Sequence, residues 1–414
     1  MSSSSYQPAD TLYLWYLGDP VRPALVGTLA LVLTGTRGVS LRYGPSWRQS
    51  GFPLSEDLPL LDMEHLPKEK EAAAGAVDDA RPDRWGERVI KLIERPSRQS
   101  LLEMLYFAGD DRFGALGVST SAETCEPHRR GSLPQLGDVD QVHDLVRKVL
   151  AGQPVPEAMR RLIAPGATMG GARPKALIDV AGEQWVLKFS EDDFSSEPLI
   201  EHAAMTLAAT AGITVAETRP VRLARGAAVA VKRFDRVPGA RVHALSAHVA
   251  LRAAGVGMSY PELAQILRRR GPTGGNRNRL QMRELFRRLV FNILIDNTDD
   301  HEKNHVLLVN DAQQYELAPA FDVLPTGQAL GYQSMAVGDR GAESSIENAL
   351  SMCRAYWLSP EEAATEAGAV ATVVNGWRKH FKARGVPKTL VDQYAGQIDR
   401  PALLQQRRQF ARFA

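Results

Sequence analysis

The stretch Ile295–Val309, which reads IDNTDDHEKNHVLLV, decides the fold class of this chain. It follows an amphipathic run, RELFRRLVFNIL, that is typical of a helix. The Asn, Thr and Asp residues that come next favour a cap or a turn over continued helix. The final VLLV is typical of a strand. The sequence therefore predicts a helix, a polar loop and a strand in that order.

The polar loop contains His301-Glu302-Lys303-Asn304-His305, which fits the H-E-x-x-H pattern of zinc proteases. Such a zinc site requires both histidines on one face of a continuous helix, one turn apart. Here turn-forming residues interrupt the helix, and a strand follows His305 directly. The sequence therefore disfavours a zinc protease, and stoichiometric zinc in the purified protein would be needed to revive that interpretation.

The same loop offers the residue types that phosphoryl transfer requires. Asp299 can accept or orient the proton of a substrate hydroxyl, and Asn304 can hold a metal ion on nucleotide phosphates. VLLVN and QYELAPA then predict a hairpin, and Asp322 in FDVLP can supply a further metal contact. His301 and Lys303 can shape the loop and position phosphates. The alternative is a polar turn without a catalytic role, so other parts of the chain must decide.

Upstream segments supply further parts of such a site in the matching order. The Gly-rich stretch Gly166–Lys175, GATMGGARPK, can turn backbone N–H groups toward a phosphate, although its spacing is not that of a Walker A loop. The strand WVLKFS then presents Lys188 as a candidate phosphate contact. Glu201 in the next helix is its candidate ion-pair partner, and Glu197 is the alternative. Each sign is also compatible with an ordinary turn or a solvated strand, and their order favours a site.

These segments resemble the HipA-type serine/threonine kinase toxins of bacterial toxin–antitoxin systems. NTDDHEKNH resembles the catalytic loop N-T-D-x-H-x-K-N of that family, and LAPAFDVLP resembles its metal-binding aspartate motif. ATMGGARPKALI resembles its S-x-x-G-x-x-x-K phosphate loop, and VKRFDR resembles its hinge motif. LYLWYLGDPVRPALVGTLAL and RYGPSWRQSG resemble its N-terminal module. The resemblance runs from Leu12 to Ala363.

The resemblance implies a role for each matching residue. Asp299 would be the catalytic base with Lys303 beside it, and Asn304 and Asp322 would hold Mg²⁺. Thr168 stands where family members often carry a serine that is autophosphorylated to switch the kinase off, so self-inactivation would be altered or slower. Lys232 stands where an acidic hinge residue is familiar. The residues implied in ATP binding are Thr168, Gly170, Gly171, Lys175, Lys188, Glu201, Lys232, Arg233, Phe234 and His301.

The pattern of elements predicts an α+β fold. Strand-like segments dominate the first hundred residues, strands and a helix mix up to about Arg236, and helices dominate afterwards. Together with the resemblance, this predicts a two-lobed protein-kinase-like fold with a small β-rich N-lobe, an all-helical C-lobe and an N-terminal β-rich module. The predicted divisions are residues 1–110, 111–236 and 237–414.

The composition limits where the chain acts and what it binds. A net charge of +2 over 414 residues excludes a polyanion binder whose charge is spread along the whole chain. Two cysteines and no secretory signature favour the reducing cytoplasm, and the apolar run Leu25–Leu33 is too short to span a bilayer. The stretch Leu267–Arg288 is locally basic. Two solvated helix faces are its ordinary interpretation, and contact with a phosphate backbone or an acidic protein face is the alternative.

The expected function is phosphorylation of a Ser or Thr hydroxyl of a bacterial protein, with ATP and Mg²⁺ as cofactors, to inhibit growth. The resemblance implies aminoacyl-tRNA synthetases as possible targets and a small helix-turn-helix antitoxin as partner, with DNA contacted only through that antitoxin and no membrane partner. One alternative is a small-molecule phosphotransferase on the same scaffold. Another is a catalytically silent binding module that acts with a DNA-binding partner.

Overall fold

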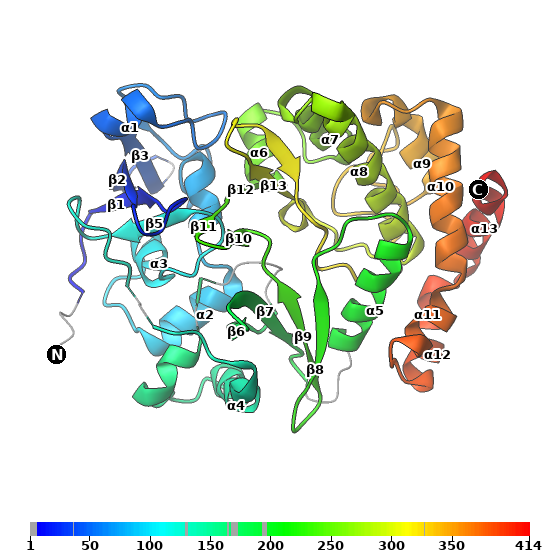
Figure 1. Cartoon of the computed structure of the whole chain (residues 1–414), viewed down its shortest axis with the longest axis horizontal. Helices are drawn as coiled ribbons and strands as arrows, with labels where there is room; N and C mark the ends of the chain where they lie inside the picture. The colour runs from blue at the N-terminus through cyan, green and yellow to red at the C-terminus, as the bar shows by residue number, and fades with distance from the viewer. Residues whose placement is uncertain are drawn as a thin grey trace. The chain divides into compact units, whose positions relative to one another are not determined.

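The computed structural model describes residues 6–35, 37–128, 131–163, 165–166, 173–192, 197–326 and 328–414, without the side chains of residues 158 and 161. The chain forms two compact units (Figure 1). Unit 1 comprises residues 1–186 and 235–245, and unit 2 comprises residues 187–234 and 246–414. These units do not coincide with the divisions expected at residues 110 and 236, which stay predictions.

Unit 1 contains an antiparallel five-stranded sheet in the order β4-β3-β2-β1-β5. Alternating burial along β1 places Leu12 and Leu14 in the core, as expected for a strand with one covered face. Leu14 lies opposite Gly27 of β2, where an added Cβ would come within 2.1 Å of a backbone oxygen, so only glycine fits. The strands are β1 (Thr11–Tyr16), β2 (Ala24–Val32), β3 (Gly38–Tyr43), β4 (Glu64–His65) and β5 (Leu116–Ser119).

Helices and short strands complete unit 1. Asp83 caps the N-terminus of α2 by accepting a hydrogen bond from the Gly86 N–H, and Val89 and Ile90 of that helix are fully buried. The helices are α1 (Pro45–Ser50), α2 (Arg84–Ile93), α3 (Leu101–Phe107) and α4 (Val139–Leu150). The remaining strands of this unit are β6 (Lys175–Val180), β10 (Arg236–Val237) and β11 (Ala240–Arg241). The division between the units falls inside β7 (Glu183–Phe189) and β12 (His243–Ser246).

In unit 2, helix α5 (Glu197–Thr210) packs on the antiparallel pair β8 (Thr218–Arg222) and β9 (Ala227–Lys232). Strands β13 (Val306–Val309) and β14 (Tyr315–Leu317) form the predicted hairpin.

Helices make up most of the rest of unit 2. Helix α8 is the longest described, and it packs against α7 and α10 through a buried face that includes Leu285, Phe286 and Leu289. It ends at Leu294, and β13 begins at Val306, so the predicted order of helix, loop and strand is confirmed. The helices are α6 (Ala247–Ala254), α7 (Tyr260–Arg270), α8 (Arg277–Leu294), α9 (Ile346–Ser351), α10 (Pro360–Asn375), α11 (Trp377–Ala383), α12 (Lys388–Ile398) and α13 (Pro401–Phe410).

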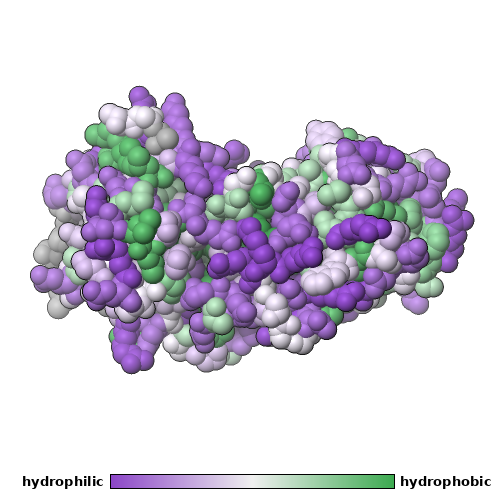
Figure 2. All heavy atoms as spheres, turned by 90° about the horizontal axis from the view of Figure 1, so that it is seen from above, coloured by the Kyte–Doolittle hydropathy of each residue, from purple (hydrophilic) through white to green (hydrophobic). Residues whose placement is uncertain are grey.

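The surface is mostly polar on the face shown in Figure 2, where hydrophobic residues emerge in small groups among hydrophilic ones. Within the part of the chain that the structure describes, no helix combines the length and the apolar character needed to cross a membrane.

Candidate functional site

The loop between α8 and β13 folds back on the backbone of Asp299. The carbonyl oxygen of Asp299 accepts hydrogen bonds from the His301 N–H at 2.9 Å and from the Asn304 side-chain amide at 3.3 Å. A short 3-10 turn, Glu302–Asn304, follows, and the His301 ring caps it by accepting from the Lys303 N–H at 3.3 Å. The Asp299 side chain is exposed, so a proton acceptor is available to a substrate at a fixed point of the loop.

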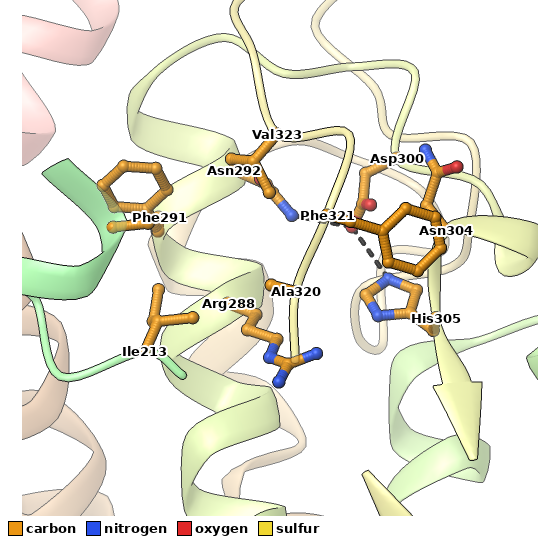
Figure 3. Close-up of a pocket in the computed structure, with 11 residues that line it drawn as sticks. Ile213, Arg288, Phe291, Asn292, Asp300, Asn304, His305, Ala320, Phe321 and Val323 are labelled. Carbon is orange, nitrogen blue, oxygen red and sulfur yellow. Dashed lines mark hydrogen bonds and ion pairs between the residues drawn. The ribbon is translucent and has the colours of Figure 1, made fainter. Parts of the chain in front are cut away.

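The neighbouring aspartate, Asp300, is buried and holds the loop in place. Its carboxylate accepts hydrogen bonds from the Tyr260 hydroxyl at the start of α7, from Asn292 Nδ2 of α8 at 2.7 Å and from His305 Nε2 at 2.9 Å. Figure 3 shows Asn292 and His305 on either side of this carboxyl group. Burial disfavours the charge, but His305 and the hydrogen bonds outweigh it and keep the pKa of Asp300 below its ordinary value.

Asn304 carries a buried side-chain oxygen of a type that can bind a metal ion. Its side-chain oxygen, Oδ1, is buried and has no hydrogen-bond partner among the described residues. Asn304 also lines a cavity of about 10 Å³ together with Asp300, Phe321 and Val323 (Figure 3). An unsatisfied buried oxygen costs about 1–3 kcal/mol, and an amide oxygen is a type of ligand that Mg²⁺ accepts. Asn304 therefore fits the metal-binding role.

Lys188 is buried between two carboxylates. Its Nζ atom lies 2.6 Å from Glu201 Oε1 of α5 and 2.7 Å from Asp322 Oδ1. Burial alone would lower the pKa of this ammonium, but Asp322 and Glu201 outweigh it, and the pKa of Lys188 is raised. Lys188 is therefore charged at neutral pH. Glu201, and not the alternative Glu197, makes the predicted ion pair.

The segment that carries Asp322 is fixed by its backbone. Two hydrogen bonds of 2.9 and 2.8 Å join Ala320 to Ala216 and Thr214, just before β8. Asp322 itself has a φ of +58°, in the left-handed region, which aspartate adopts more readily than most side chains with a Cβ. The hydrogen bonds of Ala320 therefore hold the backbone just before this aspartate.

The predicted hinge lies at the end of β9. Lys232 is the last residue of this strand, and its N–H donates to the Glu217 carbonyl at 2.9 Å. Arg233 is buried, and the Phe234 ring packs against the Phe321 ring, with centroids 5.5 Å apart. The hinge segment and the segment before Asp322 therefore meet.

The structure describes only part of the predicted phosphate loop. Thr168, Gly170 and Gly171 lie outside the residues that the structure describes. Lys175 belongs to unit 1, where its ammonium is fully buried and ion-paired with the Asp83 carboxylate. Contact between Lys175 and a phosphate would require this pair to open, and its role in ATP binding stays a prediction.

The geometry does not support the zinc protease interpretation. His301 and His305 flank a 3-10 turn and do not share one face of an α-helix, and the Nε2 atom of His305 is engaged with Asp300. Among the residues that the structure describes, no group of three or more His, Cys, Asp or Glu side chains is arranged to hold a metal ion.

Two further contacts of the loop were missed by the sequence analysis. Glu302 accepts a hydrogen bond from His248 Nδ1 at 2.9 Å, and this bond is the main reason why the pKa of Glu302 falls to about 2. Arg252 approaches the other ring nitrogen of His248 at 2.9 Å. Since a guanidinium only donates, that nitrogen accepts, and the Nδ1 proton is the one given to Glu302. His248 is far from the loop in sequence, so no local pattern could reveal it.

The second contact is made by Asp296, at the start of the loop. Its carboxylate accepts from the Ala329 N–H at 3.2 Å and forms an ion pair of 2.8 Å with Arg400, the residue that caps α13. Its carbonyl accepts from both the N–H and the hydroxyl of Thr326. Asp296 therefore joins the loop to the segment after Asp322 and to the C-terminal helices.

Comparison with known families adds the identity of the fold. The model "HipA N-terminal domain" matches residues 22–119, and the model "HipA-like C-terminal domain" matches residues 167–377. The second match alone covers half of the chain. The chain belongs to the HipA family.

One curated relative of this HipA-family chain is a protein of Sinorhizobium fredii (strain NBRC 101917 / NGR234) named "Putative kinase Y4dM". It is 30% identical over 254 residues, which are 56% of this chain and 56% of the relative. The chain therefore spans about half the length of the curated relative that it matches.

Among solved structures, the chain resembles HipA of Shewanella oneidensis MR-1, determined in a complex of that toxin–antitoxin system with HipB and operator DNA. The match has a TM-score of 0.64, covers 97% of this chain and 98% of that one, and has 19% sequence identity. The predicted α+β, protein-kinase-like fold of the HipA type is confirmed by this match.

Proposed function

We propose that this HipA-family chain is an ATP- and Mg²⁺-dependent serine/threonine-protein kinase that acts as the toxin of a toxin–antitoxin system. The observation that carries the proposal is the buried group of Lys188, Glu201 and Asp322, in the same unit as Asp299 and Asn304. Kinases use a lysine paired with a helix glutamate to contact nucleotide phosphates, and a nearby aspartate to hold Mg²⁺.

In the proposed reaction, a hydroxyl oxygen of the protein substrate attacks the γ-phosphorus of ATP and ADP leaves. Asp299 accepts the hydroxyl proton, for which its exposed side chain on a fixed backbone is suited. Lys188 contacts the phosphates, and Asn304 and Asp322 hold Mg²⁺. When bound, Mg²⁺ neutralises the phosphate charge. Positioning and charge neutralisation supply most of the acceleration of this reaction class.

The partners follow from the same proposal. The substrate is a bacterial protein, with an aminoacyl-tRNA synthetase as the candidate that the family suggests. A helix-turn-helix antitoxin neutralises the kinase and carries it to DNA, and the Shewanella HipA structure with HipB and operator DNA supports such a partner. Thr168 is the proposed site of self-regulation by phosphorylation.

The test is intact-mass spectrometry with peptide mapping after incubation with Mg-ATP, with wild type beside Asp299→Asn. A phosphate gained only by the wild type supports the kinase, and its location on Thr168 would support self-regulation. Growth arrest on expression, absent with Asp299→Asn, would support the toxin role and disfavour a small-molecule phosphotransferase. Absence of both self-phosphorylation and ATP turnover in the wild type would refute the proposal.

A further inference from the structure

Trp357 is exposed on the surface of unit 2 in an unusual backbone conformation. Its relative exposure is 44%, and it ends the 3-10 turn Cys353–Tyr356 with a φ of +62°. A bulky side chain in the left-handed region is an outlier that calls for an explanation. Strained residues cluster at ligand-binding and active sites.

Two arginines lie over the Trp357 ring. The Arg268 guanidinium, from the last turn of α7, is 4.9 Å from the ring centroid. The Arg279 guanidinium, from the first turn of α8, is 5.6 Å from it. Cation–π contacts of this kind hold guanidinium groups in place at a surface. The two cations are therefore fixed beside the indole.

The arginines of the basic stretch Leu267–Arg288 differ in how far ion pairs within the fold neutralise their charge. Most of its second half is neutralised inside the fold. Arg268 makes no ion pair among the described residues, and the nearest carboxylate to Arg279, Glu362, is 4.0 Å away. The neutralising pairs are Arg277–Glu316, Arg283–Glu362, Arg283–Glu366, Arg287–Glu366 and Arg288–Glu284. Within α8, the charge least committed to the fold therefore belongs to Arg279, beside Trp357.

Exposed apolar side chains come from the same elements. Leu280 follows Arg279 on α8 and is 59% exposed, and Met352 precedes the turn that ends at Trp357 and is 36% exposed. We call Arg268, Arg279 and Trp357 the Trp357 patch. Trp and Arg are the residue types that dominate protein-binding hot spots.

We propose that the Trp357 patch is a docking site for an acidic segment of a protein partner that also carries apolar side chains. Guanidinium groups bind carboxylates through paired hydrogen bonds, and the exposed indole of Trp357 would receive an apolar side chain. Nucleic-acid binding would need a row of cations that follows the phosphate backbone. The adjacent arginines of α8 instead form ion pairs with Glu362 and Glu366. Two arginines around one indole suit a short acidic peptide.

The patch is connected to the catalytic loop through α7. This helix starts with Tyr260, which donates to Asp300, and reaches Arg268 eight residues later, about 12 Å along its axis. The patch therefore lies at the end of α7 opposite the one that contacts Asp300. The proposal does not depend on phosphoryl transfer, since binding can be measured without ATP.

The test is fluorescence anisotropy with the full chain and a fluorescein-labelled peptide of about 12 residues that repeats Glu-Glu-Leu. A Lys-Lys-Leu peptide and a single-stranded RNA of equal length are the comparison probes. The patch variants are Arg268→Glu/Arg279→Glu and, separately, Trp357→Gly, which suits the positive φ. The matched control is Arg222→Glu/Arg225→Glu, a charge reversal at exposed positions around the β8–β9 turn.

We expect the acidic peptide to bind wild type and control equally, and to bind each patch variant at least about tenfold more weakly. Circular dichroism must show the same folded spectrum for all four proteins, and a single Arg279→Glu replaces any variant that fails. Equal affinity for the patch variants, tighter binding of the RNA, or no binding of the acidic peptide to wild type would each overturn the proposal.

Discussion

Lys188 Nζ lies 2.7 Å from Asp322 Oδ1 and 2.6 Å from Glu201 Oε1, so one buried cation joins β7, α5 and the segment that follows β14. The three groups together carry one net negative charge. A cation bound beside Asp322 would offset this charge, which is consistent with the metal role proposed for that residue. The ion pairs have a structural role as well as a proposed catalytic one, and the two can be separated by experiment.

Replacing Lys188 should destabilise the fold even without ATP. In Lys188→Met, two buried carboxylates lose their cation, and the free energy of unfolding should fall by about 3 kcal/mol. Urea denaturation measures the loss. Lys91→Met is the matched control, because the Lys91–Glu87 pair is 3.2 Å long and exposed, and its loss should cost less than about 1 kcal/mol. Equal losses in the two variants would contradict a buried structural pair.

Replacing Asp299 should lower activity, whereas replacing the adjacent Asp300 should lower stability. Asp299→Asn should lower kcat about 10²- to 10⁴-fold and leave stability unchanged, because this side chain is exposed. Asp300→Asn should lower the free energy of unfolding by about 3 kcal/mol, since Tyr260, Asn292 and His305 lose a buried charged acceptor. Thermal denaturation and ATP turnover, measured on both variants, decide this. A stable but inactive Asp300→Asn variant would contradict the structural role expected of Asp300.

Much of the fold and part of the site could be predicted from the sequence. Short-range patterns define the helix before Leu294, the strand after His305 and the pairing of Lys188 with Glu201. These features depend on residue periodicity and on order along the chain, and both can be read directly.

The contacts that fix the site could not be predicted, because they join residues far apart in the sequence. The Asp-Asp doublet does not reveal that Asp300 is buried against Tyr260, nor does any local pattern connect Arg400 to Asp296. The ion pair between Lys175 and Asp83 is a further contact that no local pattern reveals, and the phosphate contact expected of Lys175 stays a prediction.

Removing the side-chain oxygen of Asn304 should weaken Mg²⁺ binding and leave the fold intact. Asn304→Ala should raise the Mg²⁺ concentration needed for half-maximal turnover roughly tenfold. Stability should change by less than about 1 kcal/mol, because the loss of a buried acceptor without a partner offsets the loss of the amide hydrogen bond to the Asp299 carbonyl. A magnesium titration of turnover measures the first effect and urea denaturation the second. Asn375→Ala, an exposed asparagine at the end of α10, is the control and should change neither.

Glu302 should make the free energy of unfolding depend on pH in the acidic range. The hydrogen bond from His248 lowers the pKa of Glu302 to about 2 in the folded state, below its unfolded value of about 4.3. Its contribution is therefore complete above the unfolded pKa and is lost as pH falls through the folded one. Allowing for solvent screening, the stability difference between wild type and Glu302→Gln should shrink by about 1–2 kcal/mol between pH 6 and pH 3.

Urea denaturation at both pH values measures this difference. In a His248→Leu background, the hydrogen bond is absent, the folded pKa returns toward its ordinary value, and the pH dependence of the difference should largely disappear. A difference between wild type and Glu302→Gln that is the same at pH 6 and pH 3 would show that Glu302 does not titrate in this way.

Arg400 should act on the loop between α8 and β13 from the C-terminal helices, beyond the residues 167–377 that the HipA-like C-terminal model matches. Burial raises the pKa of Asp296 even with Arg400 beside it, so Arg400→Leu would leave a costly buried carboxylate. The free energy of unfolding should fall by about 3 kcal/mol. Kcat should fall while ATP affinity stays close to wild type, because Asp296 positions the loop and contacts Thr326 and Ala329.

Hydrogen exchange separates this local effect from general damage. In Arg400→Leu, amides around Thr326 and Ala329 should exchange faster, while those of β1 and β2 in unit 1 should not change. Adding Asp296→Asn removes the unpaired charge, and the double variant should recover most of the lost stability. Arg378→Leu is the matched control, since Arg378 is 48% exposed in its pair with Asp399 and its loss should cost less than about 1 kcal/mol. Faster exchange in unit 1, or no recovery in the double variant, would contradict a specific link between Arg400 and the loop.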